Sequence, residues 1–266
     1  LKLISSLFLI NRSILGPGFL HSLKILKKYN KNIKIKKIKS GTRVFDWVIP
    51  KEWICYNAYI EDCNGNKIID FNKNNLHLVS YSKSVNKILH FRDLKKKLHF
   101  IKKKPNLIPY VTSYYKKDWG FCLSYNEYKK INKNSKYKVI INSKLKNGFL
   151  RYGEIFIQGK SKKEFIFTSY LCHPSMVNNE LVGPTLLLAL SKIIGAKLNN
   201  YSYRILIIPE TIGSISYLSK NYDKIKFNIN YGFVVTCIGD NSNFSFIRSK
   251  YEDTSINHDL NLFFKS

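Results

Sequence analysis

The sequence predicts an α/β fold, with a sheet flanked by helices, together with a smaller β-rich unit. After residue 136, apolar runs typical of buried strands alternate with apolar helices, a pattern that places helices on the faces of a sheet. Residues 44–80 instead contain short runs separated by turn residues, as antiparallel strands do. The 266 residues, of which 44% are hydrophobic, exclude wholesale disorder and allow one large domain or two smaller ones.

The first half of the chain is expected to start with a helix over residues 16–28. Apolar residues recur there at helical spacing, and Gly16-Pro17 is a typical helix start. The strands expected next cover residues 45–49, 54–60, 67–71 and 76–80, with a hairpin signal at Asn64-Gly65-Asn66. A basic connection at 95–105 and an aromatic segment at 110–125 complete this β-rich unit. We expect those aromatic residues to form a core or a domain interface rather than a pocket.

The second half is expected to build the main sheet. Its predicted strands cover residues 137–142, 149–157, 164–169, 203–209 and 231–237, and its predicted helices cover 181–194 and 212–220. In sheets of this kind, functional sites form at the carboxyl ends of the strands.

The charge of the chain raises the question of nucleic acid. There are 45 Lys and Arg against 17 Asp and Glu, a formal net charge of +28, which favours phosphate or another anionic surface. However, Lys, Asn and Ile are overused along the whole chain, and runs such as 34–39 and 102–104 lie where solvated faces and loops are expected. The sequence contains no helix-turn-helix, zinc-finger or RNP-like pattern, so we do not expect specific nucleic-acid binding.

Cysteine usage and hydropathy indicate the compartment. The five cysteines are an odd number without a C-x-x-C pair, which argues against a disulfide framework and is typical of a reducing cytoplasm. No apolar run reaches the roughly 18 to 20 residues that span a bilayer. We therefore expect a soluble, cytoplasmic protein without a membrane partner. Leu1 and the helix-like residues 261–266 suggest a fragment at both ends.

Metal-compatible side chains follow three successive strands of the predicted sheet. His173 and Glu180 flank the first strand-to-helix turn, Glu210 follows the second strand, and Asp240 lies just past the third. Such side chains at neighbouring strand ends can bind one metal ion. Taken singly, each also has a purely structural explanation. His173 can be a turn residue before proline, and Asp240 a turn former. Glu180 and Glu210 can be first-turn carboxylates favoured by the helix dipole. The joint placement keeps a metal site open beside those alternatives.

Five sequence blocks resemble one known family. They are residues 11–19 (NRSILGPGF), 40–53 (SGTRVFDWVIPKEW), 110–122 (YVTSYYKKDWGFC), 172–184 (CHPSMVNNELVGP) and 209–215 (PETIGSI). In this order they resemble the bacterial aminopeptidase-like family of domain-of-unknown-function proteins, often encoded among polysaccharide-biosynthesis genes. The resemblance runs from end to end of the chain.

This family is similar in fold to zinc exopeptidases, the clan of bacterial leucyl aminopeptidase and glutaminyl cyclase. The resemblance implies three parts: residues 1–45 begin the aminopeptidase-like domain, residues 46–135 are an inserted small β-rich domain, and residues 136–266 continue the α/β domain, C-terminally incomplete. A winged-helix domain, and a further His in a Glu-Tyr-His-Thr-Ser-like segment, would lie beyond Ser266. We therefore expect a fragment with an incomplete metal site.

Carried over by motif, the resemblance implies particular zinc ligands. His173 and Asp240 correspond to ligands, and Glu210 corresponds to a ligand or the general base. Glu180 is a further expected ligand, because it can supply a carboxylate that the clan carries one position earlier. The expected metal ligands are thus His173, Glu180, Glu210 and Asp240, with Glu210 also catalytic, and the expected cofactor is one or two zinc ions.

The chain also departs from the clan pattern at three points. The clan's Asp-Asn pair, whose Asp bridges two metals, reads Asn179-Glu180 here. Its His-x-Asp reads His173-Pro174-Ser175, and its paired Glu-Glu reads Glu210-Thr211. Because of these departures, the protein could also hold only one metal ion or none.

The function that the resemblance implies is a zinc-dependent aminopeptidase-like hydrolase. Its substrate would be an amide bond in a small peptide or an amide-linked sugar derivative, with zinc activating a water and Glu210 transferring its proton. The alternative is a noncatalytic binding or regulatory protein on a degenerate peptidase scaffold. A polyanion-binding module, resting only on charge, is a third reading. A homo-oligomer is left open.

Overall fold

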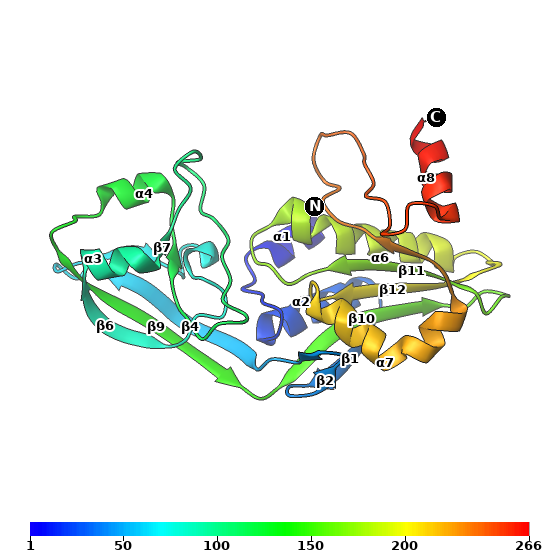
Figure 1. Cartoon of the computed structure of the whole chain (residues 1–266), viewed down its shortest axis with the longest axis horizontal. Coiled ribbons are helices and arrows are strands. Elements are labelled where there is room, and N and C mark those ends of the chain that lie inside the picture. The colour runs from blue at the N-terminus through cyan, green and yellow to red at the C-terminus, as the bar shows by residue number, and fades with distance from the viewer. Residues whose placement is uncertain (266) are drawn as a thin grey trace.

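The computed structural model describes residues 1–265 and contains two main sheets that lie end to end along the molecule (Figure 1). The larger sheet has five strands in the order β1-β10-β12-β11-β13. Strands β11, β12 and β13 are parallel, whereas β10 is antiparallel to both β12 and β1. The bounds are Lys34–Lys39 (β1), Phe149–Ile157 (β10), Glu164–Tyr170 (β11), Ser202–Ile208 (β12) and Ile229–Val234 (β13). The predicted α/β class is confirmed.

Helices cover both faces of this sheet. Adjacent residues of a strand point to opposite faces, and in β10 Gly153 faces α2 while Tyr152 contacts Tyr217 of α7. Helix α6 lies on the α2 face, where Asn30 at the end of α2 donates a hydrogen bond to Ser191 of α6 at 2.8 Å. The helices of this part are Lys2–Phe8 (α1), Pro17–Tyr29 (α2), Val177–Glu180 (α5), Val182–Gly195 (α6), Ile212–Asn228 (α7) and Ser255–Lys265 (α8).

The second sheet is antiparallel and has four strands in the order β5-β4-β9-β6. Alternate residues of its two long strands form a core, with Ala58 and Ile60 of β4 opposite Ile141 and Val139 of β9, all at most 1% exposed. The bounds are Lys67–Asp70 (β5), Glu52–Glu61 (β4), Lys136–Lys146 (β9) and Val85–His90 (β6). Around it lie Arg43–Val44 (β2), Trp47–Val48 (β3), Asn75–His77 (η1), Phe91–Leu94 (α3), Lys95–Lys97 (η2), Leu98–His99 (β7), Phe121–Cys122 (β8) and Tyr125–Lys130 (α4).

The hairpin predicted at residues 64–66 is confirmed. It joins β4 to β5, and the carboxylate of Asp62 stabilises it by accepting hydrogen bonds from the backbone N–H groups of Asn64 and Asn66, each at 2.9 Å. This is the local side-chain bonding that favours Asp at turns.

Several sequence predictions for this half need correction. Residues 76–80 do not form a strand, because the side chain of Asn74 caps a 3-10 helix there by accepting the N–H of Leu76 at 3.0 Å. The run 34–39, expected in solvated faces and loops, is solvated as expected but forms a strand that was not predicted, the edge strand β1. Its lysines are exposed while Ile38 is buried. The sheet of the β-rich unit also extends past the expected boundary at residue 135, because β9 pairs with both β4 and β6.

The two sheets are connected by the chain and by direct contacts. Residues 147–148 carry the chain from β9 into β10 (Figure 1). The N–H of Trp53 donates to the carbonyl of Leu15 at 3.2 Å, and the hydroxyl of Ser175 donates to the side chain of Asn75 at 2.8 Å. Across residues 1–265, no helix combines the length and the apolar character needed to cross a membrane.

Candidate metal centre

The site forms where the parallel strands end. His173 lies three residues beyond β11, and Glu210 lies two residues beyond β12, the neighbouring strand. Together with Cys172 they form a group whose Nδ1 or Nε2, Sγ and carboxylate oxygen all lie within 4.8 Å of one another. We call Cys172, His173 and Glu210 the strand-end cluster. Its location agrees with the general position of sites in such sheets.

The backbone beside these strand ends is strained. Ser175, Thr211 and Cys237 each have a positive φ, of 52°, 57° and 53°, although none is glycine. At Thr211 the chain makes a γ-turn, in which the N–H of Ile212 donates to the carbonyl of Glu210 at 2.6 Å. Such strain costs of order 1–3 kcal/mol per residue and concentrates at functional sites. The positive φ values at Ser175 and Thr211 turn the chain sharply just after His173 and Glu210.

Glu180 holds His173 from behind. Its side chain has no exposed surface, and its Oε2 accepts the backbone N–H groups of Cys172 at 2.6 Å and His173 at 3.0 Å. Its other oxygen, Oε1, lies 2.6 Å from Nδ1 of His173. Burial of the ring lowers the pKa of His173, but the hydrogen bond and charge of Glu180, helped by the charge of Glu210, outweigh burial and raise that pKa above its ordinary value.

The other ring nitrogen of His173 faces Glu210. Nε2 lies 3.4 Å from Oε2 of Glu210, whose side chain is 45% exposed. With its proton on Nδ1, beside Glu180, the neutral ring would leave the lone pair of Nε2 on the Glu210 side. A carboxylate behind one nitrogen and an open lone pair on the other is the usual arrangement of a metal-binding histidine.

Cys172 is a weaker donor. Burial, and then the charge of Glu180, raise the pKa of its thiol well above the ordinary value, so the thiol stays protonated. Its sulfur accepts the backbone N–H of Glu210 at 3.3 Å. Because a metal binds the thiolate rather than the thiol, Cys172 would have to lose its proton first.

Asp240 lies outside the strand-end cluster. Its carboxylate is exposed and accepts hydrogen bonds from Nδ2 of Asn178 and from the N–H of Ser242, each at 2.8 Å. These bonds, with that of Ser242 the largest, lower the pKa of Asp240. Of the four expected ligands, the structure therefore brings His173, Glu180 and Glu210 together, with Glu180 behind the ring.

The β-rich unit also contributes to the site, through the segment between β7 and β8. The ring of Tyr110 packs on the ring of His173 with centroids 4.7 Å apart, and its hydroxyl is 2.9 Å from that of Tyr114. Arg12, on the segment between α1 and α2, donates to the carbonyl of His173. Sequence reasoning did not single out Arg12, Tyr110 or Cys172 as site residues, although each lies in a family-like block, which was the available signal.

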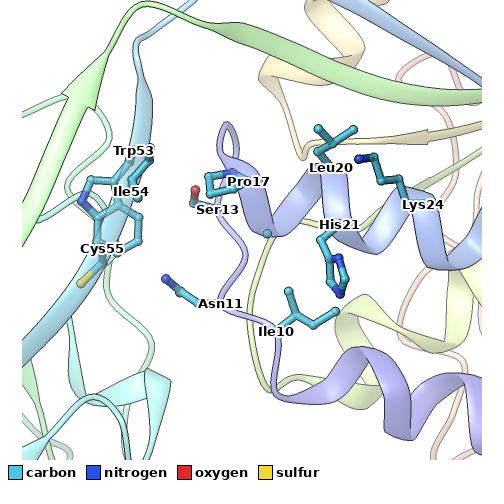
Figure 2. A pocket seen from close by; sticks show the side chains of 11 residues that line it. Ile10, Asn11, Ser13, Pro17, Leu20, His21, Lys24, Trp53, Ile54 and Cys55 are labelled. Atoms are coloured by element: carbon cyan, nitrogen blue, oxygen red, sulfur yellow. The ribbon is translucent and has the colours of Figure 1, made fainter.

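A concave pocket of about 530 Å³ lies elsewhere, between α2 and β4 (Figure 2). Trp53, Ile54 and Cys55 form one wall, and the segment around Asn11 forms the other together with one face of α2. None of the strand-end cluster residues lines it. The chemical groups and this cavity are therefore separate features.

The strand-end cluster offers the kinds of donor atom that zinc accepts. An imidazole nitrogen and a carboxylate oxygen are zinc donors, and the ring already has the carboxylate partner that metal-binding histidines use. Catalytic zinc sites use three protein ligands and keep an open position. His173 and Glu210 provide two donors directly, and Cys172 is the third donor within reach.

The chain is similar to known proteins along almost its whole length. A family model described as domain of unknown function (DUF4910) matches residues 1–265. A Clostridium acetobutylicum protein, named as a candidate polysaccharide biosynthesis protein with an aminopeptidase-like domain, is 45% identical over 255 residues, covering 96% of this chain and 58% of that protein. A crystal structure of a candidate peptidase from Clostridium acetobutylicum matches with a TM-score of 0.92 and 44% identity, over 96% of this chain and 60% of that one. The chain thus spans less than two thirds of these relatives' length.

More distant solved structures share the fold. A zinc aminopeptidase from Bacillus subtilis matches with a TM-score of 0.60 at 10% identity, over 90% of this chain and 68% of that one. A peptidase M28 precursor from Shewanella amazonensis matches with a TM-score of 0.52 at 9% identity, over 87% and 69%. The predicted zinc-exopeptidase-like sheet flanked by helices is confirmed by this likeness of fold.

Proposed function

Because the chain belongs to the family described as domain of unknown function (DUF4910), and its fold is aminopeptidase-like, we propose that it is a zinc-dependent hydrolase of an amide bond. Family membership confirms the resemblance that the five sequence blocks indicated. The proposed substrate is a peptide or an amide-linked sugar derivative. The name of the Clostridium acetobutylicum relative supports a role in polysaccharide biosynthesis.

The observation that carries this proposal is the geometry around His173. Its Nδ1 is engaged by Glu180 at 2.6 Å, and its Nε2 faces Glu210 at 3.4 Å. In this arrangement His173 would hold zinc through Nε2 and Glu210 through a carboxylate oxygen. When bound, zinc lowers the pKa of a water molecule and polarises an amide carbonyl.

The residues of the chain have separate roles in the proposed reaction. The carboxylate oxygen of Glu210 that does not hold the metal takes a proton from water and returns it to the leaving amine. Glu180 fixes the orientation and tautomer of His173 through Nδ1. Tyr110 lies against the His173 ring at a tilt and would limit the access of water from that side.

The test combines metal content with hydrolysis. The protein, His173→Ala and Glu210→Gln are compared by mass spectrometry for zinc and with leucine p-nitroanilide for amide hydrolysis. We expect about one zinc per chain, lost in His173→Ala, and a fall in hydrolysis of roughly 10²–10⁴-fold in Glu210→Gln. Glu252→Gln removes an exposed carboxylate, 79% exposed, and serves as the matched control. No zinc in the unaltered protein together with unchanged hydrolysis in Glu210→Gln would overturn the proposal.

A second function is a noncatalytic binding protein on a peptidase scaffold. It is favoured by Asn179, which stands where the resembled clan has its metal-bridging Asp and whose amide donates to the hydroxyl of Tyr170 at 3.3 Å. Calorimetric titration with leucinamide separates the two. Binding that persists in His173→Ala, in protein that holds no zinc and cleaves no amide, supports this second function.

A further inference from the structure

Arg12 is a buried charge without an ion-pair partner. It is 0% exposed, and among the residues that the structure describes no carboxylate lies within 4.0 Å of its guanidinium nitrogens. Burial lowers its pKa to about 10, and the charge of Glu180 acts in the opposite direction. The side chain is therefore still a cation at neutral pH. A buried cation that does not form an ion pair is costly, so its presence needs a reason other than packing.

Its donors instead bind two backbone carbonyls. Nε and Nη2 both donate to the carbonyl of His173, at 3.2 Å and 2.8 Å, and Nη1 donates to the carbonyl of Leu7 at the end of α1. Hydrogen bonds from a charged donor are shorter and about twice as strong as neutral ones. A second contact also joins the end of α1 to the turn after His173: the N–H of Ser175 donates to the carbonyl of Phe8 at 3.2 Å.

His173 thus contacts two buried side chains of opposite charge, Arg12 on one side and Glu180 on the other. Arg12 holds its carbonyl, while Glu180 holds its backbone N–H and its Nδ1. With both peptide groups and one ring nitrogen engaged, the direction of Nε2 toward Glu210 is fixed. The positive φ of Ser175, two residues on, is strained and favours relaxation of this turn.

We propose that Arg12 is a positioning residue that holds His173 in the orientation needed to bind metal. This inference rests on the proposed function, because it concerns the metal of that same site. A residue kept only for packing makes the opposite prediction. If Arg12 served only packing, replacing it by an apolar side chain of similar volume would leave the zinc affinity unchanged.

The experiment measures zinc affinity by competition with a chromophoric chelator in metal-free protein. The variants are Arg12→Met, Arg12→Lys and, as an exposed arginine control, Arg92→Met on α3. Loss of a group that orients a metal ligand typically weakens metal affinity 10–100-fold. We expect a weakening in this range for Arg12→Met, a smaller one for Arg12→Lys, which keeps a charged donor, and no change for Arg92→Met.

A second readout does not depend on metal. The N–H groups of Cys172 and His173 are bonded to Glu180, so hydrogen exchange at these amides reports whether the turn is held. We expect faster exchange there in metal-free Arg12→Met and Arg12→Lys. If Arg12→Met fails to fold, the affinity and exchange of Arg12→Lys decide.

The outcomes are distinct. Zinc binding by folded Arg12→Met within twofold of the unaltered protein, with unchanged exchange, overturns the role of Arg12 and leaves the proposed function intact. Failure of the unaltered protein to bind zinc overturns both. Weakened zinc affinity with faster local exchange supports the role.

Discussion

Arg204 of β12 donates from Nε and Nη2 to the two carboxylate oxygens of Glu164 on the adjacent strand β11, at 2.7 Å and 2.9 Å. Its remaining guanidinium nitrogen donates to Glu154 of β10, on the other side, at 2.5 Å. Arg204 and Glu164 are 4% and 3% exposed. One buried arginine therefore cross-links three central strands of the sheet that carries the site.

Replacing this arginine is expected to destabilise the fold strongly. Arg204→Met leaves Glu164 as a buried charge without a partner, and breaking a buried pair in this way costs about 3–5 kcal/mol. Urea unfolding followed by circular dichroism measures the change, with Arg248→Met, an exposed arginine at 51%, as the control. Adding Glu164→Gln to Arg204→Met should restore much of the loss. A single-variant loss below about 1 kcal/mol would contradict a central role of the pair.

Glu180 is expected to matter for folding as well as for the site. Glu180→Ala leaves the backbone N–H groups of Cys172 and His173 buried without an acceptor, and each such group costs about 1–3 kcal/mol. The free energy of unfolding of metal-free protein should therefore fall by about 2–6 kcal/mol. Glu252→Ala, at an exposed position, should change it little. Equal stability of the two variants would show that those N–H groups find other partners.

The cover that Tyr110 provides can be measured by chemical modification. His173 has an 11% exposed side chain, and the ring of Tyr110 lies against it at 4.7 Å. We expect Tyr110→Ala to increase the rate at which diethylpyrocarbonate modifies His173 severalfold, as followed by peptide mass spectrometry. Tyr56→Ala removes an exposed tyrosine of β4 and is the control. An unchanged rate would mean that the four-stranded unit does not shield the site.

His99 gives the protein a pH dependence of known sign. Burial, and then the charge of Lys97, lower the pKa of His99 below its ordinary value of 6.5, while Asp118 opposes this. The unfolded chain therefore binds a proton more readily than the folded one, so stability is lost as the pH falls below about 6.5. We expect His99→Asn to reduce the fall in unfolding free energy between pH 7.5 and 5.5. A steeper fall in the variant would contradict the lowered pKa.

The periodicity of apolar residues predicted those strands and helices whose side chains alternate between the core and the surface. The strand predicted at residues 149–157 coincides with β10, and the helix predicted from residue 212 begins there as α7. The helix α1 and the edge strand β1 were not foreseen. Burial does not alternate along β1, because Ile38 is its one buried side chain and its lysines are exposed. Whether a short, charged run joins a sheet depends on the strand that it pairs with, here β10, and the local sequence does not show that strand.

The sequence predicted that His173 and Glu210 lie close together, but not how the groups around them are oriented. His173 and Glu210 could be placed together because parallel strands end at one edge of a sheet. The side on which Glu180 approaches the ring depends on how the backbone turns at Ser175, and no local pattern predicts that positive φ. Arg12 lies 161 residues from the carbonyl it binds, so its contact depends on tertiary structure alone.

The lysines of β1 have a consequence for association. Lys34, Lys36, Lys37 and Lys39 stand exposed along one open edge of the five-stranded sheet, where unpaired N–H and C=O groups would otherwise accept a strand from another molecule. A second copy approaching that edge would bring its own lysines against them, and like charges at this spacing repel. The same residues that conceal the strand in the sequence therefore protect the sheet against edge-to-edge aggregation.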